Sequence, residues 1–183
     1  MDHTVKATWG IKEIAFADLG KITSAVWEQV SLTKQGTFAL TDTPATLTPV
    51  FAEEEDEPLV NKVQKGGTRQ IQISMPDVSS AIAEFLGGTV TSVGTGAEKV
   101  NRFSFGSNIV NKMVRITPVD GNAKYIYITN GQITHNLSGS LTKAGDDTLD
   151  VQLTIAINKG LGGATYESEG LLFDEADPEA VGG

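Results

Sequence analysis

The segment from Arg69 to Gly88, with the sequence RQIQISMPDVSSAIAEFLGG, constrains the fold most strongly because it joins a strand to the one clear helix signal. In its first half Ile71, Ile73 and Met75 alternate with polar residues, which is the period of a strand with one buried face. After Pro76 the apolar residues change to helical spacing. A helix this short needs a sheet to pack against. The segment therefore predicts a helix lying on a sheet.

The predicted helix spans about residues 77–86. Asp77 is the expected N-cap, because its carboxylate can accept a hydrogen bond from the first turn and suits the positive end of the helix dipole. Gly87 and Gly88 supply the left-handed residue that commonly ends a helix. The residues expected to face the core are Val78, Ala81, Ile82, Phe85 and Leu86.

The rest of the chain predicts strands and turns, because β-branched and aromatic residues alternate with polar ones between glycines. The strongest hairpin signal is Asn130-Gly131, which suits a two-residue primed turn. Its two arms and the regular alternation over 149–157 predict a three-stranded meander. Other strands are expected within 9–19, 24–33, 37–40, 89–93, 100–105 and 108–119.

Thr41 to Lys65, the segment before the strand and helix, is open to two interpretations. It contains prolines and the acidic run Glu53 to Glu57. One interpretation is an exposed loop that its charges keep solvated and disordered. The other is a long hairpin with arms at Leu47–Ala52 and Leu59–Lys65 and the acids at its tip. Such a hairpin would reach beyond the domain and become ordered in an assembly.

The net charge of −9 comes from two segments. Of 23 acidic residues, five lie at 53–57 and six follow Lys159, so 12 acids remain against 14 bases in the rest of the chain. The body is therefore nearly neutral, and no basic stripe for tight nucleic-acid binding is present. We expect one β-rich domain over 1–165 and an acidic tail over 166–183. The apolar cluster at 171–173 is expected to dock either on the domain or on a partner.

Catalytic and metal-binding patterns are not found in the sequence. The chain has no cysteine, which excludes disulfides, thiol nucleophiles and thiolate metal sites. Neither His3 nor His135 has a nucleophile and an acid at a recognisable spacing, and His135 falls on the apolar side of its strand. The acidic run lacks the spacing of a calcium loop, and Gly94-Thr95-Gly96 lacks the third glycine of a dinucleotide cradle. We expect no catalytic residue, cofactor or metal.

No signal peptide or membrane-spanning run is expected either, because the N-terminus lacks an apolar core and no stretch approaches about 20 apolar residues. A soluble intracellular product is the simplest interpretation.

The order of strand, DVSSAIAEFLGG helix, strand and meander, preceded by the long segment 41–65, resembles the phage tail tube (major tail) protein family. That family is related to the tube proteins of contractile injection systems, and the resemblance covers most of 9–157. It implies a mainly β (α+β) fold, an antiparallel β-sandwich or barrel with one short helix packed on it. It also implies a virion protein whose rings, usually hexamers, stack into a hollow tube that delivers DNA.

Carried onto this chain, the resemblance assigns ring stacking to the segment before the helix, with the acids at its tip. The implied partners are further copies of the chain, the tape-measure protein and other tail proteins. DNA would pass through an acidic lumen without specific binding, and the protein would reside in the phage tail after assembly in the host cytoplasm. The implied ring-stacking residues are Phe51, Glu53, Glu54, Glu55, Asp56, Glu57 and Leu59.

Two other classes of function remain as alternatives. The first is a monomeric β-sandwich binding module of the adhesin or carbohydrate-binding type. Two tryptophans and three tyrosines offer little for an aromatic sugar platform. The second, an enzyme, is the weakest hypothesis, because no catalytic constellation is found.

Overall fold

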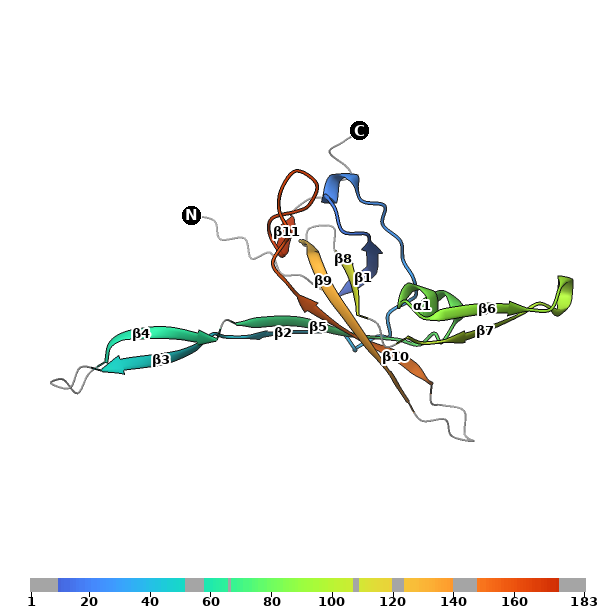
Figure 1. The fold of residues 1–183 in the computed structure, drawn as a ribbon, viewed down its shortest axis with the longest axis horizontal. Coiled ribbons are helices and arrows are strands. Elements are labelled where there is room, and N and C mark those ends of the chain that lie inside the picture. The colour runs from blue at the N-terminus through green and yellow to red at the C-terminus, as the bar shows by residue number, and fades with distance from the viewer. Residues whose placement is uncertain are drawn as a thin grey trace.

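The computed structural model describes residues 10–51, 58–65, 67–106, 109–119, 124–139 and 148–174. Over these ranges the fold is mainly antiparallel β with a single α-helix (Figure 1). The main sheet contains β1 (Ile11–Ala17), β2 (Ala39–Thr43), β5 (Thr68–Met75), β8 (Val110–Pro118), β9 (Tyr125–Ser138), β10 (Asp150–Ile157) and β11 (Leu171–Asp174). Its strand order is β1-β8-β9-β10-β5-β2, and β11 pairs with β9. Because β1 and β2 lie at opposite ends, the described strands form an open sheet and no closed barrel.

Two hairpins extend from this sheet in opposite directions (Figure 1). The first arm consists of β3 (Thr46–Phe51) and β4 (Pro58–Lys65). The second arm consists of β6 (Thr89–Val93) and β7 (Val100–Ser104). Short 3-10 helices, η1 (Ile22–Ser24) and η2 (Gly96–Glu98), complete the described elements. Of the two interpretations of the segment 41–65, the structure shows the hairpin.

One face of the main sheet carries the hydrophobic core. Ile71, Ile73 and Met75 on β5 are buried, as their alternation predicts, and β1, β8, β9 and β10 contribute further buried residues. The helix α1 (Ser80–Phe85) packs on this face through Ile82, which is fully buried. Each fully buried side chain of this size contributes about 1.5–3 kcal/mol of gross transfer free energy. The stability of the molecule is therefore concentrated in this sheet and helix.

The helix is shorter than predicted and its core-facing set differs at one position. Ile82 and Leu86 are buried, and Val78 and Phe85 are partly buried against the core. The expectation for Ala81 is wrong, since Ala81 is exposed and Ala83 is buried instead. The apolar spacing is compatible with either alanine, and the later start of the helix turns Ala83 inward.

The helix has a different N-cap from the predicted one, and its C-terminal end is closed by local hydrogen bonds. Ser79, and not Asp77, is the N-cap, and its hydroxyl donates to the Asp77 carboxylate at 3.2 Å instead of capping the helix. At the other end Gly87 has a positive φ, its N–H donates to Glu84 O, and Gly88 N–H donates to Ala83 O. This pair of bonds is the Schellman ending that the two glycines predict.

The predicted hairpin turn at Asn130-Gly131 is wrong, because β9 continues through both residues. A primed turn needs positive φ at its two central residues, and neither residue has it. Instead β9 carries a bulge here: between Lys112 and Val114 the strand β8 advances two residues, while its partner β9 advances three, from Gly131 to Ile128. A meander exists, but it consists of β8, β9 and β10.

The strand predicted within 24–33 is also wrong, since the structure shows only an isolated bridge between Phe16 and Glu28 there. The aromatic residue that favoured a strand, Trp27, is partly buried by contacts with other parts of the chain. The Trp27 ring lies 5.8 Å from the Tyr127 ring, and the Arg115 guanidinium lies 5.2 Å from Trp27. Residues 24–33 therefore form no strand and cover one end of the sheet.

The first part of the predicted acidic tail belongs to the domain. Leu171 to Asp174 form β11, so the apolar cluster at 171–173 docks on the chain itself. The Glu167 carboxylate accepts a hydrogen bond from Ile22 N–H, which holds the preceding loop. Residues 175–183 lie outside the described ranges. None of the described helices is long and apolar enough to cross a membrane.

Candidate assembly surface

Almost all residues of the two arms whose burial the structure describes are exposed. Every residue of β6 and β7 is exposed, and so is every residue of β3 except Val50. An isolated two-stranded ribbon is at best marginally stable in water, because it has no sheet face to cover its side chains. These arms therefore present surface that is typical of chains that assemble.

The first arm presents an apolar face along β3. Leu47, Pro49 and Phe51 alternate with Thr48 and Val50, so they share one side of the ribbon. Leu47 and Phe51 are 54% and 55% exposed. The predicted ring-stacking residue Phe51 thus lies at the outer end of β3, paired with Pro58. Of the other predicted residues, 53–57 lie outside the described ranges, and so does the side chain of Leu59.

The second arm carries apolar pairs across its two strands. Val93 pairs with Val100 next to the turn, and Val90 pairs with Phe103 nearer the helix. Val93 and Val100 are 43% and 59% exposed. The sequence predicts both strands correctly but assigns them no contact role. Two valines flanking an exposed turn were the signal that could have identified this second surface.

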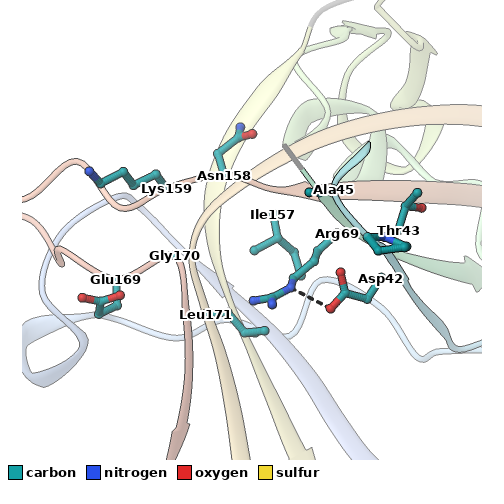
Figure 2. A pocket seen from close by; sticks show the side chains of 12 residues that line it. Asp42, Thr43, Ala45, Arg69, Ile157, Asn158, Lys159, Glu169, Gly170 and Leu171 are labelled. Atoms are coloured by element: carbon teal, nitrogen blue, oxygen red, sulfur yellow. Dashed lines mark hydrogen bonds and ion pairs between the residues drawn. The ribbon is translucent and has the colours of Figure 1, made fainter. Parts of the chain in front are cut away.

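The root of the first arm borders a cavity of about 680 Å³ (Figure 2). Asp42 on β2 accepts a hydrogen bond from Arg69 Nε on β5 at 3.0 Å, and both side chains are more than half exposed. Lys159 and Glu169 on the opposite wall add one charge of each sign. Such exposed pairs contribute little to stability. The cavity has balanced charge and separates the arm from the segment that leads to β11.

The strands at this root are held close together by a glycine. A Cβ at Gly67 would lie 2.7 Å from Thr43 O, so only glycine fits between the strands there. This contact sets where the arm leaves the sheet.

An apolar groove of about 570 Å³ lies on the body between the segment 32–38 and strands β1, β8 and β9. Its wall includes Leu32, which is 72% exposed, and Val119, which is also exposed. Phe38 and Ile126 are partly buried against the core beneath it. Lys12 lies at its edge. Glu13 and Lys34 also line it, so the groove combines apolar side chains with two cations and one anion.

One end of the sheet is fastened by a buried carboxylate. Lys34 Nζ donates a hydrogen bond of 2.6 Å to Asp150 Oδ2, and Thr148 Oγ1 donates one of 2.7 Å to Asp150 Oδ1. The hydrogen bond from Lys34, followed by that from Thr148, lowers the pKa of Asp150 below its usual range. This contact joins the segment before β2 to the start of β10.

Among the described residues there is one histidine, and it lies in a packing contact. His135 is partly buried, and its ring lies 5.7 Å from the Phe105 ring in a packing contact. Within the ranges that the structure describes, no three histidines or acids are grouped so that they could hold a metal ion. Comparison of the sequence with models of known protein families gives no match, and comparison with curated proteins gives none either.

Proposed function

We propose that this chain is the structural subunit of a phage tail tube. Copies form rings, hexameric in the form that the resemblance implies, and the rings stack into a hollow tube through which DNA is delivered. The observation that carries the proposal is the pair of exposed, partly apolar arms on opposite sides of one sheet.

A tube needs two kinds of contact, one around each ring and one between successive rings. Contacts between different surfaces of identical chains generate closed rings or open helical assemblies. Two arms that point in opposite directions provide two such surfaces on each copy. We assign stacking between rings to the first arm and contact within the ring to the second.

The groove on the body is the surface that the first arm of a second copy would contact. Leu47 and Phe51 would leave water for the apolar hollow at Leu32 and Val119. The acidic run that follows Phe51 in the sequence complements Lys12 at the groove edge. Apolar contact and charge thus favour the same pairing.

A β-barrel or sandwich would be completed only in the ring. Within the described residues β2 pairs with β5 along one edge, and its other edge has no partner strand. An unpaired strand edge exposes N–H and C=O groups that readily pair with another chain. Strand pairing between neighbours would close the open sheets around the tube axis. The tape-measure protein and other tail proteins would then be partners of the tube. In this proposal the chain itself has no enzymatic activity.

The arm contact can be tested with the variant Leu47→Ser/Phe51→Ser. Sedimentation velocity should show polymers for the wild type and only single rings or subunits for the variant, because the stacking face has lost its apolar side chains. Thr48→Ser, on the other side of β3, is the matched control and should polymerise normally. The unfolding midpoint should be the same in all three proteins, since the arm lies outside the core.

A double variant that polymerises like the wild type would overturn the role of the first arm. A wild type that stays monomeric at high concentration would instead favour the monomeric binding module.

A further inference from the structure

The face of the main sheet opposite the core has two parts. Its β1–β8 end carries Arg115 and Tyr127, whereas the part formed by β2, β5, β10 and the second half of β9 consists of uncharged side chains without aromatic rings. Residues directly opposite each other in antiparallel strands share a face. One row across this face consists of Ala39 on β2, Gln72 on β5, Thr154 on β10 and Thr134 on β9. The rows on either side contain Ser74, Gln152 and Asn136, and Gln70, Ala156 and Gln132. We call these ten residues the neutral face.

None of the ten residues is charged, although 20% of the chain is. The next row contains the acidic residue Asp150, which forms an ion pair with Lys34. Gln72, Gln152 and Asn136 are exposed, so these amides remain in contact with water. The neutral face is therefore an open surface that lacks both ions and large apolar side chains.

This composition excludes the usual binding surfaces. Protein interfaces depend on a few large anchors such as Trp, Tyr or Arg, and the neutral face has none. Binding to DNA through its phosphates needs lysine or arginine. The neutral face also has no aromatic side chain on which a sugar ring could stack. It therefore does not suit the carbohydrate-binding module that was the alternative function. What remains is a wet surface that a polyanion can approach without being held.

We propose that the neutral face lines the lumen of the tube and faces the DNA. The inference rests on the proposed function and deepens it, because it names the surface along which DNA moves. It also changes the expected electrostatics. The acids of this chain are concentrated in the segment 53–57 and after Lys159, so the surface facing DNA avoids binding by lacking charge and not by repelling phosphates.

The chain has no cysteine, so single cysteines can report which surface faces the lumen. Gln72→Cys and Gln152→Cys place a thiol on the neutral face, and Thr23→Cys places one in η1, on an exposed site away from it. Each variant is assembled into tubes and treated with N-ethylmaleimide or with a polyethylene-glycol maleimide too large to enter the tube. The same reactions on unassembled subunits give the reference rates.

In subunits, all three cysteines should react with both reagents. In tubes, the two cysteines of the neutral face should keep their reaction with the small reagent and lose at least about tenfold in rate with the large one, because only small molecules diffuse into the lumen. Thr23→Cys should react with both reagents.

Reaction of the neutral face with the large reagent at the subunit rate would place it outside the tube and overturn the inference. Loss of both reactions would make it a contact between subunits, with the same consequence. Both results leave the proposed function standing, because tubes have formed. If wild-type protein forms no tubes, the proposed function fails, and the inference fails with it.

Discussion

At the scale of single residues, Gly131 shows how a turn signal can serve a different purpose. A Cβ at this position would lie 2.9 Å from Ile155 Cγ2 and 3.1 Å from Lys112 O, so glycine is required by the approach of both neighbouring strands. The bulge beside it changes which alternate residues of β9 face the core. Even-numbered residues such as Ile128 face it before the bulge, and odd-numbered ones such as Ile133 face it afterwards. Asn-Gly therefore marks a change of face within one long strand.

Gly131→Ala should lower the free energy of unfolding by about 1–3 kcal/mol, because the added methyl overpacks the contact between β8, β9 and β10. Urea denaturation checks this value. Gln132→Ala, at the next position, is the control and should change stability by less than about 0.5 kcal/mol. Equal effects of the two substitutions would show that the strands can separate enough to accept a side chain.

Asp150 should make stability depend on pH. Its pKa is lower in the folded than in the unfolded state, because Lys34 and Thr148 donate hydrogen bonds to the carboxylate. The carboxylate therefore stabilises the fold above the ordinary aspartate pKa of about 3.9, and this contribution is lost as the pH falls through the lower folded pKa.

Asp150→Asn should consequently be less stable than the wild type at neutral pH, and the difference should shrink as the pH falls below the ordinary aspartate pKa of about 3.9. Urea denaturation at several pH values measures it. The control Asp42→Asn removes an exposed ion pair and should have a smaller effect. A difference between wild type and Asp150→Asn that stays constant with pH would refute the role of the carboxylate.

At the scale of elements, the helix and the first arm depend on different forces. Ile82 is buried in the core, and Phe85 packs on the Phe16 ring at 4.8 Å while staying partly exposed. The described residues of β3 belong to no core cluster, and the arm leaves the sheet at a tight root beside Gly67. We therefore expect damage to the helix to affect folding and damage to the arm to affect assembly.

Ile82→Ala should cost about 3 kcal/mol or more of unfolding free energy, because it leaves a cavity under the helix. Phe85→Ala should cost somewhat less, about 2–3 kcal/mol, since its ring is only partly buried. Ala81→Ser, on the exposed side, serves as the control. Thermal unfolding of the three variants distinguishes them, and an unchanged midpoint for Ile82→Ala would mean that the helix does not hold this face of the core.

Much of this level was predictable from the sequence, because strands with one buried face leave a period-two pattern. The alternation at 71–75 and 149–157 and the glycines after the helix locate β5, β10 and the helix end. Which strands pair with one another was harder to predict from the sequence. Whether Asn130-Gly131 turns or continues depends on β8 and β10, which lie on either side of it. Trp27 is partly buried by tertiary contacts, which leave no periodic pattern in the local sequence.

At the scale of the whole molecule, the chain is an open sheet with two arms on opposite sides and one neutral face (Figure 1). The sequence offered the first arm as one of two interpretations of the segment 41–65, because its charges and prolines fit a solvated loop as well as a hairpin. It could not identify the neutral face, since that face is formed by alternate residues of four strands whose order only the fold provides. In the proposed tube, the first arm would join successive rings and the neutral face would line the lumen.

Self-assembly is the central claim, and negative-stain electron microscopy of the purified full-length chain at high concentration tests it most directly. Rings of uniform diameter that stack into hollow tubes are the predicted result, because each copy offers two arms to its neighbours. A field of separate particles of monomer size, with a monomer mass in solution at the same concentration, would contradict the claim.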